Sequence, residues 1–549
     1  MFARITLTFI ICTLTVAVAQ GAVVWGYCYL EEQPLPCLTV VEIDEGVLHV
    51  PDITDSDGRY DWLAVIPGAH TFTYSHPGYA TETHVFTVPF GGGRLPDVTL
   101  ESKAICDPAD WNHYPYALSE PEPDFTFPDV EGMHDPTSTF RAEWWYVNFH
   151  LFTDENNHEY GGFVAFFKPP IVGLPCMVLQ SIIDLEDGVP YYSHDEFPAI
   201  FLANDQWLDV TAGGNRLKNR ECEGELLPFE YHLYAGWVEG GIVQVELDMK
   251  DLKPPFAVCG DGYEDFGDAG GSYYYTHPRL DVLGKIHLPG FPAAGKDVHG
   301  YAWIDHQWGN WTPDTVTWEW ISIQLDDDRD IMVFDAWAND ETLVSCGLNY
   351  YDENCSLEVL EDYNMTVLDS YVDPVTENEF ATQWRVTESS RQMDLVVTAD
   401  DEDQIMRIGE NLVFRTCFWE GACGVSGTIG GQPVEGTAYA EVTHAPPDWQ
   451  PPGCPNPGDA GRFCTADIYP NNADGVWCYD YDGDCVVELA DLAQLLGNYG
   501  CTAGCTHEMG DVFPKNGDGA WEDGVDGDGV IDLNDLAEML GQYGDNCAR

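Results

Sequence analysis

A run of twelve residues, Val298 to Gly309, carries side chains that could perform acid catalysis. Strand residues alternate between faces with a period of two, so a strand here would place one set of polar and aromatic residues on a single face: His299, Tyr301, Trp303, Asp305 and Gln307. A carboxylic acid can protonate an alkene, ring faces stabilise the resulting carbocation, and water then adds. Burial among the rings would raise the pKa of Asp305 and keep it protonated enough to donate.

Two further strand-like segments, 143–151 and 273–279, each have a face of polar and aromatic residues. These faces comprise Trp144, Tyr146, Asn148 and His150 in the first segment, and Tyr273, Tyr275, His277 and Arg279 in the second. We expect five ligand-binding residues from the three segments: Trp144, Tyr146, His150, Tyr275 and His299. The expected catalytic residues are Asp305, Trp303, Tyr301 and, in a supporting polar role, His277. The alternative is structural, with Asp305 and His306 cross-linking strands and Trp303 and Trp308 filling the core.

Closely spaced carboxylates near the end of the chain predict a different kind of site. Positions 1, 3, 5, 9 and 12 of a twelve-residue loop are Asp480, Asp482, Asp484, Glu488 and Asp491. Calcium takes six to eight oxygen ligands, and alternate carboxylates on a turning loop supply them. The loop departs from the EF-hand pattern at position 6, which is Cys485, and at position 12, which is Asp in place of Glu. An acidic surface loop without metal is the alternative.

The tail repeats itself with a shift of 44 positions, as in Asp482-Gly483-Asp484 and Asp526-Gly527-Asp528. The ligands of the second loop would be Asp526, Asp528, Asp532 and Asp535, whereas its position 1 is Gly524. We therefore expect structural calcium in the tail. The histidines lack the His-Glu-x-x-His spacing of zinc enzymes, and we expect no cofactor for catalysis.

The composition restricts the class of protein. With 94 acidic and 22 basic residues the net charge is −72, which excludes nucleic acid as a partner. Residues 1–19 combine Arg4 with an apolar stretch that ends in Ala17-Val18-Ala19, which predicts a cleaved secretory signal. No later stretch reaches the roughly 18 apolar residues of a membrane-spanning helix, so we expect a secreted, extracellular or periplasmic protein without a transmembrane anchor.

The pattern along the chain predicts a mainly β protein of several domains. Short apolar runs between turns in 20–102 predict a small β-sandwich, and prolines and acids in 103–124 predict a linker. From 125 to 446 strand follows strand without helical periodicity, which favours two consecutive antiparallel barrels, 125–290 and 291–446. A second linker, 447–470, precedes the calcium loops of 471–549.

Cysteine spacing in an exported chain favours structural disulfides. Seventeen of the 18 cysteines follow the predicted signal, since Cys12 lies within it. Three closely spaced pairs predict local bonds: Cys28/Cys37, Cys346/Cys355 and Cys417/Cys423.

Both ends of the chain resemble known modules. Asp55-Ser56-Asp57-Gly58-Arg59-Tyr60, followed by Ser75-His76-Pro77-Gly78-Tyr79, resembles the carboxypeptidase regulatory-like domain, an Ig-like module that is usually an accessory. The tail resembles type I dockerins, with two loop-and-helix segments that each contain an Asp-Leu-Ala sequence. Dockerins bind cohesins, so this resemblance implies attachment to a cohesin-like or cell-surface scaffold.

The centre of the chain resembles the carotenoid 1,2-hydratase family, also called hydroxyneurosporene synthase or AttH-like. The resemblance rests on Glu143-Trp144-Trp145-Tyr146 and on Gly300-Tyr301-Ala302-Trp303-Ile304-Asp305-His306-Gln307-Trp308-Gly309. It implies two lipocalin-like β-barrels. Some members hydrate an isolated carbon–carbon double bond, relatives catalyse cyclisations, and in the hydratases an aspartate at the position of Asp305 is the proton donor.

These observations leave three functions open. The first is a hydratase or related lyase or isomerase that acts on an apolar unsaturated molecule in the barrel. The second is an exported carrier of apolar ligands, for which the same aromatic face would suffice. The third is a polysaccharide-active or scaffold-attached accessory protein, which the tail favours and the central motifs do not.

Overall fold

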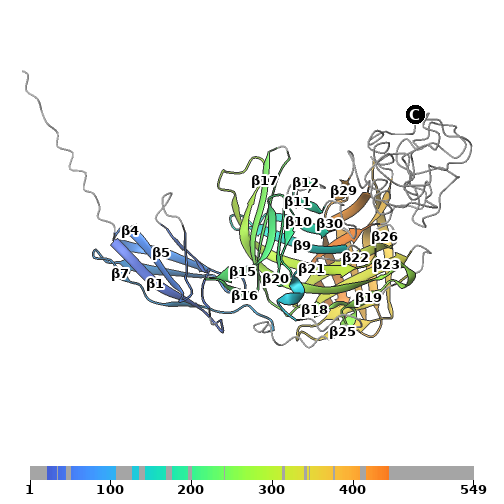
Figure 1. Ribbon diagram of the computed structural model, residues 1–549, viewed down its shortest axis with the longest axis horizontal. Helices are drawn as coiled ribbons and strands as arrows, with labels where there is room; N and C mark the ends of the chain where they lie inside the picture. Colours follow the sequence, from blue (N-terminus) through green and yellow to red (C-terminus); the bar gives the residue numbers. More distant parts are fainter. Residues whose placement is uncertain are drawn as a thin grey trace, which may run out of the picture. The chain divides into compact units, whose positions relative to one another are not determined.

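The computed structural model describes most of the chain between Ala22 and Thr443 (Figure 1). The described ranges are 22–33, 35–44, 51–106, 126–134, 142–168, 176–195, 201–239, 241–311, 316–338, 343–344, 346–374, 378–408 and 416–443. The predicted signal, most of the first linker and the whole tail, with all nine expected calcium ligands, lie outside them. The chain divides into two compact units, one of residues up to 103 with 221–225 and one of the other residues from 104 onwards.

The first unit is built from two small β-sheets. One places β1 between β4 and β7 and also pairs β8 with β1, and the other has the order β3-β2-β5-β6. The strand bounds are β1 Ala22–Leu30, β2 Val40–Ile43, β3 Asp52–Ile53, β4 Arg59–Val65, β5 Gly68–Ser75, β6 Glu82–Val88, β7 Gly93–Arg94 and β8 Val98–Leu100. Both sheets contribute to one hydrophobic core, where the hydroxyls of Tyr60 and Tyr74 lie 2.7 Å apart.

The second unit contains two large antiparallel sheets, each curled into a half-barrel (Figure 1). The first has the order β12-β11-β10-β9-β21-β20-β17-β16-β15-β14-β13, with β18 and β19 paired to β20. Its strands are β9 Ala142–Thr153, β10 Glu159–Lys168, β11 Met177–Asp184, β12 Val189–Asp195, β13 Phe201–Ala203, β14 Asp209–Ala212, β15 Asn215–Cys222, β16 Glu225–Val238, β17 Ile242–Asp251, β18 Phe256–Ala257, β19 Tyr263–Asp265, β20 Gly271–His287 and β21 Lys296–Gly309.

The second large sheet has the order β25-β24-β23-β22-β31-β30-β28-β27-β26, with β29 paired to β30. Its strands are β22 Val316–Leu325, β23 Asp330–Ala338, β24 Leu348–Tyr351, β25 Leu357–Leu360, β26 Tyr363–Val372, β27 Glu379–Glu388, β28 Met393–Ala399, β29 Ile405–Ile408, β30 Thr416–Ile429 and β31 Gln432–Val442. Helical structure in the described part of the chain includes the short 3-10 turns η2 Asp129–Glu131, η3 Val258–Gly260 and η4 Gly267–Ala269. The mainly β prediction, with two lipocalin-like half-barrels, is therefore confirmed.

The three largest hydrophobic cores of the described residues organise this second unit. One fills the first half-barrel, one fills the second, and a third, rich in aromatic rings, lies between the two sheets. The alternation in β17 shows how the strands form, because Val243, Val245, Leu247 and Met249 all point into the first core. The first sheet includes β21, which pairs with β9 and β20, so it extends past residue 290, where we expected it to end.

The disulfide pattern differs from the expected local pairs. Among the described residues, the bonds are Cys37–Cys222, Cys106–Cys355 and Cys259–Cys346, which join residues 87 to 249 positions apart. The predicted pairs Cys28/Cys37 and Cys346/Cys355 are therefore wrong. Cys417 and Cys423 do not pair either, because both lie on β30, where six residues of extended chain separate them by about 20 Å. Long-range packing of strands, which spacing does not reveal, selects the partners.

Among the described residues, no helix has the length and hydropathy that crossing a membrane would require.

Candidate functional site

Three neighbouring strands of the first half-barrel, β9, β21 and β20, assemble a polar and aromatic face. Asp305 on β21 lies opposite Tyr146 on β9 and Thr276 on β20. Trp303 lies opposite Asn148 on β9. Residues directly opposite each other in antiparallel strands have their Cβ atoms about 5 Å apart, so these side chains share one surface. The two motifs, about 150 residues apart in sequence, thus become adjacent strands.

The carboxyl group of Asp305 accepts hydrogen bonds from side chains on β20 and β21. The Tyr274 hydroxyl donates to Oδ2 at 2.6 Å, and Nε1 of Trp303 donates to Oδ1 at 2.7 Å. Asp305 is only 3% exposed. Burial raises its pKa to about 6, although hydrogen bonds from Thr276, Tyr274 and Trp303 favour the charged form and limit the rise. The group therefore exchanges protons near neutral pH.

Two acids from the second half-barrel, Glu420 on β30 and Glu441 on β31, lie close to this face. The Tyr146 hydroxyl donates to Oε1 of Glu420 at 2.6 Å. Glu420 and Glu441 are direct cross-strand partners. Burial and the neighbouring Glu441 raise the pKa of Glu420 well above its usual range, and burial raises the pKa of Glu441 to about 7. The site thus raises the pKa values of three carboxyl groups.

Sequence reasoning missed Glu420 and Glu441. Both are acids within otherwise apolar strand segments, Cys417 to Ala422 and Ala438 to Val442. Charged residues are rarely buried without a partner, so an acid flanked by aromatic and small apolar residues is a usable signal. Their pairing with each other and with the first half-barrel depends on the tertiary structure.

Aromatic rings surround the three carboxyl groups. The ring of Trp320 lies 5.7 Å from that of Tyr146 and 6.2 Å from that of Trp303, edge to face in both cases. The ring of Phe163 stacks at 5.8 Å on Tyr146, and Phe334 lies 6.0 Å from Tyr274. These centroid distances are typical of aromatic pairs. The result is an apolar site in which the carboxyl groups are the polar feature.

Tyr301 and His299 do not join this site. The first half of β21 is alternately buried and exposed, and only its second half, from Ala302 onwards, is buried on both faces. Tyr301 is therefore 39% exposed, with the Arg279 guanidinium 5.6 Å from its ring centre, and His299 pairs with Asp154 at 2.7 Å. The expectation that Tyr301 lines a pocket with Asp305 is wrong, because the shared face extends beyond the part that the second sheet covers.

His277 and Tyr275 lie on the opposite face of β20 from the residues that contact Asp305. Tyr274 and Thr276 face Asp305, so the alternation directs their neighbours into the first half-barrel. There Nδ1 of His277 lies 2.8 Å from Oδ2 of Asp251. Burial lowers the pKa of His277, but the carboxyl groups of Asp251, Glu131 and Asp305 together more than offset this, so the pKa is raised. The polar role expected beside Asp305 thus falls on Thr276 and Tyr274.

The remaining expected residues lie around the margin of the aromatic region. Trp144 packs against Trp311 and Trp318, with ring centres 5.1 and 6.0 Å away. His150 is buried on the face of Tyr146, and its Nε2 lies 3.0 Å from the carbonyl oxygen of Ala438 on β31. His150 thus links the two sheets.

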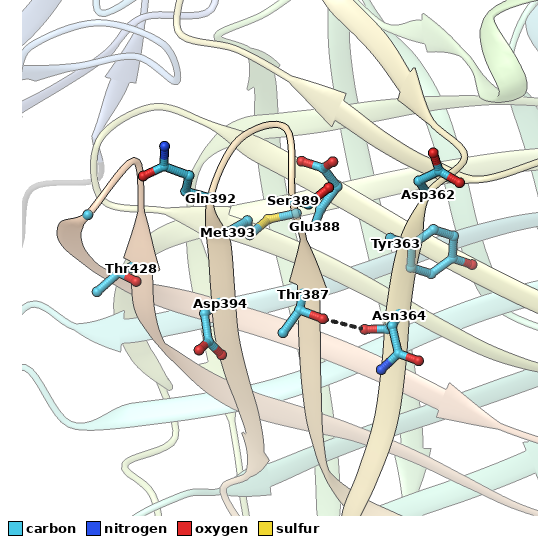
Figure 2. A pocket seen from close by; sticks show the side chains of 11 residues that line it. Asp362, Tyr363, Asn364, Thr387, Glu388, Ser389, Gln392, Met393, Asp394 and Thr428 are labelled. Atoms are coloured by element: carbon cyan, nitrogen blue, oxygen red, sulfur yellow. Dashed lines mark hydrogen bonds between the residues drawn. The ribbon is translucent and has the colours of Figure 1, made fainter.

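A separate pocket of about 620 Å³ lies at the turns of the second half-barrel (Figure 2). Its lining is mostly polar and includes Asp362, Asn364, Thr387, Glu388 and Asp394. The Thr387 hydroxyl donates to the backbone oxygen of Asn364 at 3.5 Å, which joins β27 to β26. None of the residues expected to act on a ligand lines this pocket.

The central region is similar to a known protein family and to solved structures. The AttH-like family model matches residues 202–444, which include Asp305, Glu420 and Glu441. A structure described as an AttH of Nitrosomonas europaea is 23% identical, with a TM-score of 0.50, over 60% of this chain and 98% of that chain. Kievitone hydratase from Nectria haematococca is 18% identical, with a TM-score of 0.49, over 62% of this chain and 97% of that chain.

A cohesin–X–dockerin complex of Acetivibrio cellulolyticus is 20% identical over 16% of this chain and 67% of that chain, and its TM-score of 0.14 does not establish a shared fold. Comparison with curated proteins finds no match. The likeness to the Nitrosomonas europaea structure shows a shared fold. Residues 202–444 thus resemble the AttH-like family.

Proposed function

We propose that the second unit adds water to, or isomerises, an apolar unsaturated molecule between its two sheets, with Asp305 as the proton donor. The observation that carries this proposal is a carboxyl group buried among aromatic rings, with a pKa raised to about 6. At pH 7 about one such group in ten holds its proton, which is sufficient for repeated donation.

The chemistry needs one acid and one water molecule. Asp305 transfers its proton to one alkene carbon, and the neighbouring carbon becomes a cation that the rings of Trp303 and Tyr146 stabilise. Water attacks the cation through oxygen, and its extra proton returns to Asp305, which restores the acid. Loss of a carbon-bound proton to Asp305 in place of water attack would give the isomer.

The charge of the site favours an uncharged substrate. Burial raises the pKa of Glu420 well above its usual range and that of Glu441 to about 7, so both groups carry less negative charge near neutral pH than exposed glutamates do. The surrounding rings would bury the apolar surface of a bound ligand. Each Å² of that surface removed from water contributes about 25 cal/mol to the free energy of binding. A hydrocarbon-like ligand with an isolated double bond is both uncharged and apolar, as this site requires.

A carrier of apolar ligands is the second candidate. Asp305, Trp303 and Tyr274 are each at most 3% exposed. Side chains this deeply buried would shield a carbocation from bulk water in an enzyme. They would equally hold an apolar molecule in a carrier.

The test compares three proteins: the wild type, Asp305→Asn and Asp297→Asn. Asp297 is an exposed acid on the same strand and provides the matched control. Each protein is incubated with lipid and isoprenoid extracts in heavy-oxygen water, and bound ligands and products are followed by mass spectrometry. Labelled product from the wild type and the control, but not from Asp305→Asn, supports hydration, and unlabelled isomer with the same dependence supports isomerisation. Equal ligand retention by all three proteins without product would leave the carrier.

The ends of the chain extend the proposal on sequence grounds. We propose that the protein is secreted and that calcium orders the tail, which would attach it to a cohesin-like or cell-surface scaffold. The support is the spacing of the carboxylates in 480–491 and their repeat 44 residues later. If the tail rather than the barrel determined function, the protein would act as a scaffold-attached or polysaccharide-active accessory.

A further inference from the structure

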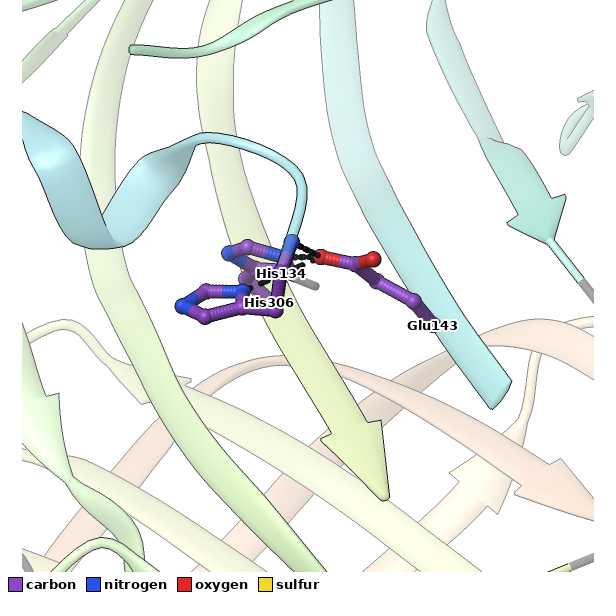
Figure 3. Close-up of side chains that lie close together, drawn as sticks. All are labelled: His134, Glu143 and His306. Carbon is purple, nitrogen blue, oxygen red and sulfur yellow. Dashed lines mark hydrogen bonds and ion pairs between the residues drawn. The ribbon is translucent and has the colours of Figure 1, made fainter. Parts of the chain in front are cut away.

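One end of the first half-barrel gathers three side chains of the types that bind transition metals: His134, Glu143 and His306 (Figure 3). Glu143 lies at the start of β9, and His306 lies near the end of the adjacent strand β21. His134 follows the turn η2 and reaches the same place from outside the sheet. His306 neighbours Asp305 in sequence but points to the opposite face, so this cluster is separate from the site proposed above.

Two of the donor-atom separations in the cluster are close to those around a tetrahedral ion. Oε1 of Glu143 lies 3.0 Å from Nδ1 of His134 and 3.1 Å from Nε2 of His306, and all three atoms lie within 4.8 Å of one another. A zinc ion with bonds of about 2.0 Å to nitrogen and oxygen places its ligand atoms about 3.3 Å apart. Shifts of a few tenths of an ångström at the two contacts to Glu143, together with movement of the two imidazole nitrogens from within 4.8 Å of each other to about the same spacing, would convert the cluster into a coordination shell.

The second layer around these side chains is the kind that supports metal ligands. A ligating histidine usually hydrogen-bonds through its other nitrogen, and Nδ1 of His306 lies 3.0 Å from the Tyr275 hydroxyl. Ligating carboxylates are also hydrogen-bonded: Nζ of Lys168 donates to Oε2 of Glu143 at 3.3 Å, and the backbone N–H of His134 donates to Oε1 at 2.8 Å. Tyr275 and Lys168 therefore take the places of second-layer partners.

Two tryptophans fix the orientation of the imidazole rings. The ring of His134 stacks on Trp308 at 3.6 Å with an interplanar angle of 3°, and the ring of His306 stacks on Trp145 at 4.9 Å. Glu143 and His306 are almost fully buried, whereas 18% of the His134 side chain is exposed. The cluster is thus pre-organised in its buried part and reachable from the His134 side.

We propose that His134, Glu143 and His306 bind a divalent first-row transition-metal ion, for which zinc is the matching probe. Two imidazoles and one carboxylate suit zinc, and three protein ligands leave one position of a tetrahedron for water. The ion would link η2 to β9 and β21 and so brace the strand that carries Asp305. The competing explanation is a hydrogen-bonded cluster in which both imidazole N–H groups donate to Oε1.

The experiment measures zinc binding by the full-length chain in excess calcium, which occupies the acidic surface and the tail. Metal-free wild type, His134→Gln and His299→Gln are titrated with zinc, and with cobalt as a spectroscopic probe. His299 is an exposed histidine on β21 that also pairs with a carboxylate, so it is the matched control. We expect one tight zinc ion in the wild type and the control, and an affinity at least about 100-fold lower in His134→Gln. Tetrahedral cobalt absorption should disappear with it.

Equal zinc affinity in the wild type and His134→Gln, or octahedral cobalt spectra in both, would overturn the proposal. Zinc-edge X-ray absorption of the wild type gives a check that needs no variant. A zinc coordination shell that contains two imidazole ligands supports the site, and a shell made only of oxygen ligands refutes it. Neither readout depends on enzymatic activity, so failure here is distinguishable from failure of the proposed hydration.

Discussion

Replacement of Asp305 by Asn should change the pH dependence of stability in a defined direction. In the native protein burial raises the pKa of this carboxyl from 3.8 to about 6. Between these values the native state holds a proton that the unfolded chain has released. The stabilisation from Asp305 is therefore complete below about pH 4 and is lost as the pH rises through 6. Two pKa units correspond to about 3 kcal/mol.

Asn retains the contacts of Asp305 without titrating. Its Oδ1 can accept from Nε1 of Trp303, and its Nδ2 can donate to the Tyr274 hydroxyl. As the pH rises from 4 to 8, we expect the free energy of unfolding of Asp305→Asn to increase by about 3 kcal/mol relative to that of the wild type. The exposed control Asp297→Asn should show no comparable change, because solvent screens its ion pair with Lys285.

The assay is urea unfolding, followed by tryptophan fluorescence at several pH values, with the free energies of unfolding compared between variants. Infrared difference spectra provide a direct measurement, because at pH 5 the wild type should show the protonated carboxyl absorption of one more group than Asp305→Asn, in which the bands of Glu420 and Glu441 remain. A stability difference that is the same at pH 4 and pH 8, together with identical infrared spectra, would refute a raised pKa at Asp305. The proposed proton donor would then lack its physical basis.

Two further predictions concern other parts of the chain. Asp330 is fully buried and accepts from Nζ of Lys253 at 2.8 Å and from Nε of Arg279 at 3.0 Å, so Asp330→Asn should cost about 3–5 kcal/mol by leaving buried cations without a counter-charge. A thermal melt unchanged from that of the wild type would contradict this. Residues 471–549 should gain helical circular dichroism with calcium and lose it with EDTA, because closely spaced carboxylates repel one another until a cation neutralises them; identical spectra in both conditions would exclude the calcium loops.

The face of the site could be predicted from sequence because alternation is a local property of strands. In 298–309 it places Trp303 and Asp305 on one side, and in 143–151 it places Tyr146 and Asn148 on one side. The structure pairs exactly these residues across β21 and β9. Mainly β architecture was equally readable, since strand periodicity and turn residues recur through the whole centre of the chain.

Which residues join Asp305 was decided by the tertiary structure. Glu420 and Glu441 come from strands more than 110 residues further along the chain, and only the packing of the second sheet on the first brings them to Tyr146. The same packing covers Trp303 and leaves Tyr301 exposed, although both occupy one face of one strand.

The partners of the cysteines and of His134 were likewise decided by the tertiary structure. The three disulfides of the described residues each join distant segments, and Glu143 meets His306 across 163 residues because β9 and β21 are neighbours in the sheet. Residue spacing along a strand determines which side a group faces, because that depends on backbone geometry alone. Contact with another strand depends on long-range pairing, which the burial of whole hydrophobic faces selects.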